Sequence, residues 1–131
     1  MRLPLILAAA ALLASCATPF ADQPWVKLYD EQYLRSEQKW PMTLPQVQQA
    51  LFAHEAKCGS APQFSIDPEQ PNIAHVWYAP ESSPGLSNTV LLEIARLQSE
   101  SLRVQAYAHL GVQESEIQRV KNMILSPEVC E

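Results

Sequence analysis

TVLLEIARLQSESLRVQAYAHL, residues Thr89–Leu110, is the stretch that decides the fold of this chain. Two runs rich in strand-forming residues, 89–97 and 102–110, flank a short polar link and predict an antiparallel hairpin. Apolar and polar residues alternate along the second run, and this period of two predicts one buried and one solvated sheet face. The residues expected on the buried face are Val90, Leu92, Ile94, Leu102, Val104, Ala106, Ala108 and Leu110.

An amphipathic helix is expected well before this hairpin. Apolar residues recur at steps of three and four from Leu44 to Cys58. Thr43 and Gln46 can form a capping box at its start, and Gly59 can end it in a left-handed conformation. The pattern predicts a helix that packs one stripe against a core.

A further helix and a third strand complete the pattern. Residues 73–78 are rich in strand formers and end before Pro80, and apolar residues at helical spacing between Gly111 and Pro127 predict the last helix. Residues 60–72 hold three prolines and are expected to be an irregular connection. Residues 25–40 fit a helix in their later part, which we favour, or a short strand at WVKLY. The sequence predicts an α+β fold: a three-stranded antiparallel sheet with flanking helices on one face, in the order helix, three strands, helix, with this additional helix in front.

A short leader precedes the predicted domain. Arg2 supplies a positive charge, residues 3–12 form an apolar run, and Leu13-Ala14-Ser15-Cys16 follows. These residues resemble the signal peptide and lipobox of bacterial lipoproteins, in which a diacylglycerol is attached to the cysteine and the preceding peptide is removed. The resemblance implies a signal peptide over 1–15, a lipidated tether over 16–24 and one domain over 25–131. Secretion after Ser15 and an uncleaved anchor are the alternatives, although about 20 apolar residues are needed to span a bilayer.

The resemblance also implies a location. In enteric lipoproteins an aspartate after the lipidated cysteine favours retention in the inner membrane, and this chain has Ala17 instead. We therefore expect a domain that is lipid-anchored at the outer membrane and faces the periplasm. Its first partner is then the membrane itself, through the acyl chains on Cys16.

With Cys16 assigned to the lipid, Cys58 and Cys130 remain as one pair in a compartment that permits disulfides. We expect them to be bonded. His54 and Cys58, four residues apart, are the alternative as metal ligands on one helical face. Because only one such pair is present, we expect no metal and no other cofactor. His54 lies on the apolar stripe, where a backbone carbonyl is its expected partner.

Charge and motif content exclude several classes of function. The chain of 131 residues has a formal net charge of -5, and loss of the leader removes one further positive charge. An acidic, mixed surface argues against binding to nucleic acid and against electrostatic docking to anionic lipid. We recognise no nucleophile in a strained glycine turn, no framed carboxylate pair and no glycine-rich phosphate loop. We therefore expect this protein to have no enzymatic activity.

The solvated sheet face carries the residues that could bind a partner. Trp77, Arg103, Tyr107 and His109 are expected there, and aromatic and arginine side chains are common interface anchors. The alternative interpretation is that these residues are surface residues without a binding role, because a sheet covered on one side exposes its other side. The sequence thus predicts a non-enzymatic lipoprotein that binds an envelope protein. The alternatives are a periplasmic inhibitor or immunity protein and a small ligand- or metal-binding domain.

Overall fold

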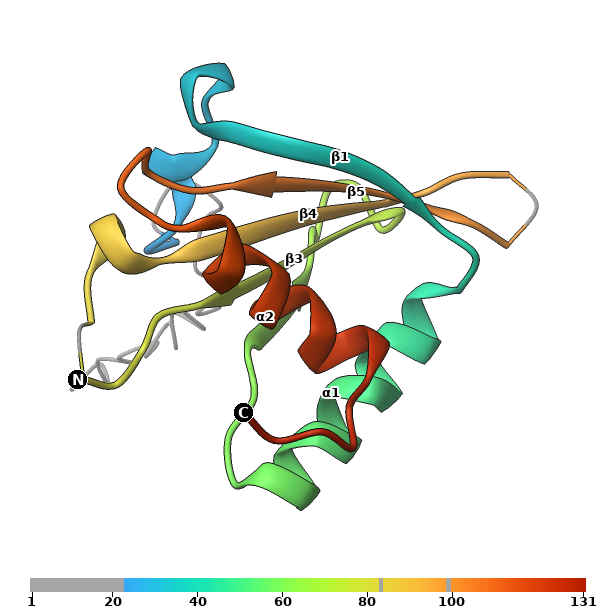
Figure 1. Cartoon of the computed structure of the whole chain (residues 1–131). Coiled ribbons are helices and arrows are strands. Elements are labelled where there is room, and N and C mark those ends of the chain that lie inside the picture. Colours follow the sequence, from blue (N-terminus) through green and yellow to red (C-terminus); the bar gives the residue numbers. More distant parts are fainter. Residues whose placement is uncertain (1–22, 83, 99) are drawn as a thin grey trace, which may run out of the picture.

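A five-stranded antiparallel sheet forms the centre of the structure, a computed structural model that describes residues 23–82, 84–98 and 100–131. The strand order is β1-β5-β4-β3-β2 (Figure 1). The strands are β1 (Leu34–Trp40), β2 (Gln63–Ile66), β3 (Ile73–Tyr78), β4 (Val90–Arg96) and β5 (Leu102–Tyr107). The leader, the lipobox and Cys16 lie outside the described residues.

The predicted hairpin is confirmed as β4 and β5. Leu92 pairs with Ala106 and Ile94 with Val104, so their side chains share one face, as the alternation predicts. However, β5 ends at Tyr107 rather than Leu110. The chain turns next, with the amide of Val112 donating to the carbonyl of His109 at 3.0 Å. Leu110 therefore lies in the turn and is 80 % exposed, so its predicted burial is wrong.

The two expected helices are present as α1 (Leu44–Cys58) and α2 (Glu114–Leu125). At the start of α1, the amide of Thr43 donates to Gln46 Oε1 at 2.9 Å and the amide of Gln46 donates to Thr43 Oγ1 at 3.4 Å. This capping box satisfies amides that have no partner within the helix. Gly59 adopts a φ of 86° at the other end, a conformation that costs glycine little.

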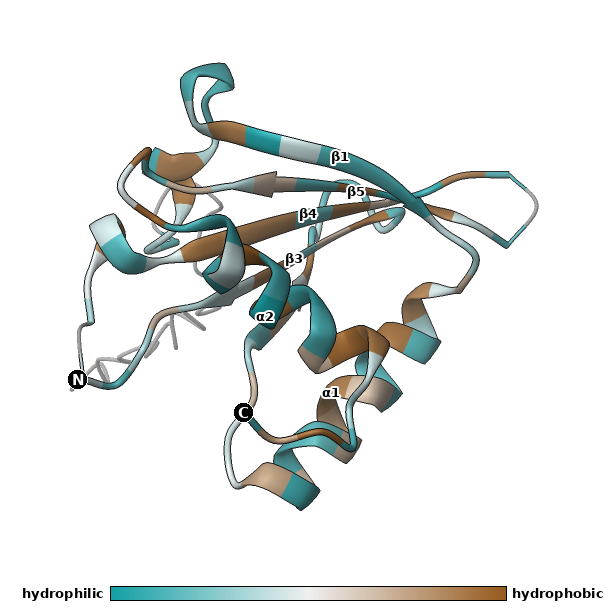
Figure 2. Cartoon of the chain, viewed as in Figure 1, coloured by the Kyte–Doolittle hydropathy of each residue, from teal (hydrophilic) through white to brown (hydrophobic). Residues whose placement is uncertain are grey.

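Both helices pack on the same face of the sheet (Figure 1). Polar and apolar residues alternate along both helices (Figure 2), and the apolar ones that are buried belong to the same core as the sheet. Burying each large aliphatic side chain in such a core stabilises the fold by about 1.5–3 kcal/mol. The core includes Val47 and Leu51 of α1, Ile117, Val120 and Ile124 of α2, and Val76, Leu92, Ile94 and Val104 of the sheet.

The expectation of only three strands is wrong, because two edge strands extend the sheet. β1 pairs with β5 along its length, for example Trp40 with Leu102, where a helix within residues 25–40 was expected. β2 pairs with β3, with Phe64 opposite Val76, inside the expected irregular connection. An edge strand has one neighbour, and its polar residues carry little periodic signal.

The disulfide is confirmed. Cys58 at the end of α1 is bonded to Cys130, which follows α2, and their Cα atoms are 5.5 Å apart. The bond joins the two helices at the end of the layer that they form on the sheet. No helix within residues 23–82, 84–98 and 100–131 is long and apolar enough to cross a membrane.

Candidate functional site

The centre of the second sheet face is covered, so its predicted exposure to solvent is wrong there, while Glu37 and Lys39 at its β1 edge are exposed. Residues 25–33, here named the N-terminal strap, contain two short 3-10 helices, η2 (Val26–Leu28) and η3 (Glu31–Tyr33). Trp25 and Leu28 of the strap are 1 % and 0 % exposed, and they form a second apolar cluster with Leu91 and Tyr107. The face opposite the helices therefore holds a small core of its own.

The four predicted partner-binding residues lie on this face, under or beside the strap. Tyr107 is only 7 % exposed, and its ring centroid is 5.4 Å from that of Tyr29. Trp77 is half-buried beside Trp25, with ring centroids 5.8 Å apart.

The other two residues, His109 and Arg103, are also half-buried. The His109 ring stacks on Tyr33 at 4.6 Å. Among the described residues, His109 Nε2 and Arg103 Nε are buried without a hydrogen-bond partner. The four residues share one side of the sheet without forming one cluster, since Trp77 and Tyr107 flank Leu91 of β4 and Arg103 lies further along β5, opposite Ala95. Their role in partner binding stays a prediction, and Tyr107→Ala would now remove packing as well as any contact.

A buried contact between a histidine and a carboxylate lies at the centre of the covered face. His75 Nε2 of β3 and Glu93 Oε2 of β4 are 3.7 Å apart, and their side chains are 3 % and 5 % exposed. The ring of Trp25 stacks on His75 with centroids 4.2 Å apart. Buried charges need partners because their desolvation is costly. The strap thus covers a polar contact, His75 with Glu93, as well as the second apolar cluster.

The environment of Glu93 shifts the pKa values of the groups around it. Burial alone would raise the pKa of Glu93, but hydrogen bonding with His75 and Tyr29 and the charge of Arg103 lower it below its usual value. The hydrogen bond to Glu93, together with burial, raises the pKa of Tyr29 to about 12. Burial and the charge of Glu93 also raise the pKa of Tyr107. The carboxylate is therefore held ionised by groups from the strap and the sheet.

We expect Glu93→Gln to change how stability depends on pH. The folded pKa of Glu93 lies below its usual 4.5, so the ionised group stabilises the fold above that pH. This stabilisation is lost as the pH falls through the folded pKa. Glu93→Gln should lower the free energy of unfolding by about 2 kcal/mol at neutral pH, the scale of a hydrogen bond to a charged group. Its deficit relative to wild type should shrink in acid.

Urea unfolding between about pH 3 and pH 7 measures this difference. The matched control is Glu55→Gln, because Glu55 is exposed on α1. Its unfolding curve should follow that of the wild type throughout. A deficit of Glu93→Gln that is constant over the whole range would contradict the assignment of Glu93 as an ionised, stabilised carboxylate.

His54 has the structural role that the sequence favours. Its Nδ1 lies 3.0 Å from the carbonyl oxygen of Pro127, and the side chain is buried. Cys58 Sγ lies 3.6 Å from the same nitrogen but is bonded to Cys130. The disulfide thus removes the thiolate that the alternative metal pair requires. No group of three or more His, Cys, Asp or Glu suited to a metal occurs in the part of the chain that the structure describes.

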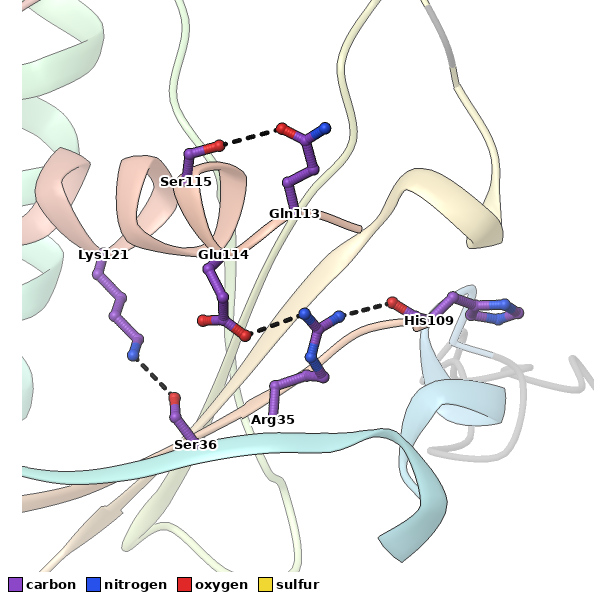
Figure 3. A network of polar contacts seen from close by, with 7 residues as sticks. All are labelled: Arg35, Ser36, His109, Gln113, Glu114, Ser115 and Lys121. Carbon is purple, nitrogen blue, oxygen red and sulfur yellow. Dashed lines mark hydrogen bonds and ion pairs between the residues drawn. The ribbon is translucent and has the colours of Figure 1, made fainter. Parts of the chain in front are cut away.

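A polar network links α2 to the edge strand β1 (Figure 3). Lys121 Nζ donates to Ser36 Oγ at 2.8 Å, and Arg35 donates to Glu114 at 2.9 Å and to the carbonyl of His109 at 2.8 Å. Burial lowers the pKa of Lys121, although the charge of Glu114 opposes this. The network fixes the helix against the sheet edge.

The sequence reasoning missed a groove at the end of the sheet where β4 and β5 are joined. This hairpin-end groove has a volume of about 630 Å³. Residues from the start of α1, the end of β2 and the β4–β5 link contribute to it, so only the tertiary fold assembles it. Its apolar lining includes Met42, Leu44, Pro45, Ile66, Pro71 and Leu97, with the charged residues Arg96 and Glu100 beside them.

The groove and the covered face differ in accessibility. Ile66 in the groove is 45 % exposed, whereas Tyr107 under the strap is 7 % exposed. A partner can therefore reach the groove without any rearrangement of the chain.

In comparisons with known proteins, no protein-family model matches this chain and no curated protein matches it.

Proposed function

We propose that this chain is a lipid-anchored, non-enzymatic binding module of the bacterial envelope, held at the outer membrane through Cys16 and facing the periplasm. The observation that carries the proposal is the lipobox-like leader, which stands before a single disulfide-closed domain. The disulfide supports it, because such bonds persist in oxidising compartments such as the periplasm. Stable anchoring requires more than one acyl chain, which a lipidated and acylated cysteine supplies.

The hairpin-end groove is the proposed contact surface for an envelope protein. Its volume lies within the range of about 300–1,000 Å³ that is common for binding sites. An apolar lining next to charges of both signs is the usual composition of a protein interface, with an apolar centre and a polar margin. The expected occupant is an apolar segment of the partner with polar residues at its ends. The half-buried residues Trp77, Arg103 and His109, with the buried Tyr107, form a second proposed contact surface, and Tyr107 becomes accessible there only if the strap moves.

The lipid anchor is tested by mass spectrometry of the purified full-length protein. We expect an amino-terminal fragment that begins at Cys16 and carries diacylglycerol and an amide-linked acyl chain. Cys16→Ser should lose the lipid mass and release the protein from the membrane fraction. An unmodified Cys16 in protein that retains residues 1–15 would contradict the anchor.

The groove is tested by placing a photo-crosslinking amino acid at Ile66 in living cells. We expect one dominant envelope-protein adduct, and we expect Ile66→Asp to weaken the same complex with purified components while the melting temperature stays nearly unchanged. The matched control position is Phe52, an apolar residue on α1 that is 63 % exposed. Equal crosslinking from both positions, or a complex that Ile66→Asp does not weaken, would contradict the groove as the contact surface. A captured toxin would identify the module as an inhibitor.

A further inference from the structure

Exposed apolar and aromatic side chains gather at one corner of the molecule. This corner, here named the aromatic corner, consists of Tyr29, Tyr33, Leu34 and Leu110. Tyr29 is 46 % exposed, Leu34 39 % and Leu110 80 %. Leu110 is the most exposed large apolar side chain of the described residues. Apolar surface at the tip of a turn is unfavourable in water unless something covers it.

Contacts between the strap and the end of β5 hold the corner together. Tyr33 stacks on His109, directly before Leu110, and the amide of Ala108 donates to the carbonyl of Tyr33 at 3.0 Å. Arg35 fixes the same turn by donating to the carbonyl of His109. Leu34 at the start of β1 pairs with Tyr107 at the end of β5, so both lie at the end of the sheet from which the turn with Leu110 follows. The corner is thus a rigid surface formed by parts distant in sequence.

The corner and the hairpin-end groove lie at opposite ends of the sheet. β4 begins at Val90 near the strap and ends at Arg96, which lines the groove. β5 runs the other way, from Leu102 in the groove lining to the turn that carries Leu110. A surface that touches the corner would therefore leave the groove accessible.

We propose that the aromatic corner rests on the lipid surface, with Leu34 and Leu110 in the interfacial region of the bilayer. This inference depends on the lipid anchor proposed above. Nine residue steps separate Cys16 from Trp25, the start of the strap, and such a chain reaches at most about 30 Å. The strap end of the domain is therefore the end held nearest to the bilayer. Exposed leucine side chains such as Leu110 gain free energy when they are buried in the apolar part of that interface.

The charges around the corner indicate which property of the membrane matters. Lys27, Asp30 and Glu31 are exposed, and Arg35 is paired with Glu114 at 2.9 Å. Charges of both signs nearly cancel, so attraction to anionic headgroups contributes little. The contact is thus apolar and interfacial, and it should persist on zwitterionic lipid and at high salt.

The test compares two labelled variants of the full-length lipidated protein in vesicles of phosphatidylethanolamine and phosphatidylglycerol. Leu110→Cys and Phe52→Cys each carry an environment-sensitive nitrobenzoxadiazole label, and both positions are exposed, so the fold tolerates them. Brominated acyl chains quench labels that enter the bilayer interface. We expect quenching to be several-fold stronger at position 110 than at position 52. This difference should change little when the salt concentration is raised or when phosphatidylglycerol is omitted.

Three results would overturn the inference. Equal quenching at both positions, or none at either, in protein whose lipid mass is confirmed would contradict the corner contact while leaving the anchored module intact. Shielding of position 110 only when a protein partner is added would assign the corner to that partner. Absence of the lipid from Cys16 would contradict both the anchor and the contact that depends on it.

Discussion

Loss of the disulfide should lower the melting temperature of this domain by about 20 °C. Cys58 and Cys130 are 72 positions apart, and closing a loop of that length removes conformational entropy from the unfolded chain worth about 4 kcal/mol. In a domain of about 100 residues, each kcal/mol corresponds to about 4–8 °C. The double variant Cys58→Ser with Cys130→Ser, measured by calorimetry, gives this difference without leaving a free thiol.

Two controls separate the covalent bond from local packing. Reduction of the wild type should give the same melting temperature as the double variant, because both remove the closed loop. The lower melting temperature of the double variant could also come from disturbed packing of His54, which contacts both Cys58 and Pro127. The melting temperature of His54→Asn in the oxidised protein measures that contribution. A double variant that melts within about 2 °C of the wild type would show that the bond contributes little.

Trp25→Ala should release the N-terminal strap. The side chain is 1 % exposed, stacks on His75 and packs against Leu91 and Tyr107, so its truncation should lower the free energy of unfolding by about 3–5 kcal/mol. Apart from the bond between the carbonyl of Tyr33 and the amide of Ala108, the backbone bonds of the strap are short-range bonds of 3-10 turns, so the strap has little stability of its own. Hydrogen exchange should therefore accelerate first in residues 25–33 and in the strands beneath them.

The matched control is Phe52→Ala, an aromatic truncation at a position that is 63 % exposed. It should change the free energy of unfolding by less than about 0.5 kcal/mol. Exchange that accelerates equally across α1 and α2 in Trp25→Ala would contradict a locally released strap. With the strap released, Trp77 and Tyr107 become accessible, so capture assays with this variant also test the second surface.

The elements that the sequence predicts correctly have strong local signals. The Thr43–Gln46 capping box and the glycine stop define α1, and the alternation around Val104 defines β5 as a half-polar strand. β1 lacks such a signal. Only Leu34 and Trp40 are apolar within it, and its strand conformation depends on pairing with β5. β2 has four residues between proline-rich segments, which is too short to show a period.

The candidate site shows the same limit. The disulfide and the backbone partner of His54 follow from residue type and spacing, so both could be predicted. The burial of Tyr107 could not be predicted, because alternation shows which side chains share a sheet face but not whether that face is covered. Trp25 and Leu28 cover that face from a segment without strand or helix periodicity, and their three-residue spacing gave no clear signal. The hairpin-end groove combines three distant segments and has no local pattern at all.

The pairing of β1 with β5 has a consequence for the order in which the protein can fold. Ser36 lies opposite Ala106, so β1, the first strand within residues 23–131 that the structure describes, pairs there with a strand that follows it much later in the sequence. Contacts of such high sequence separation form slowly, because a long loop must close first. A nascent or partly exported chain therefore keeps β1 unpaired until β5 has emerged, whereas Trp25 of the strap can pack earlier on His75 of β3 and Leu91 of β4. Any truncation before β5 leaves β1 without its partner strand, so the shortest form of the domain with a complete sheet extends through β5.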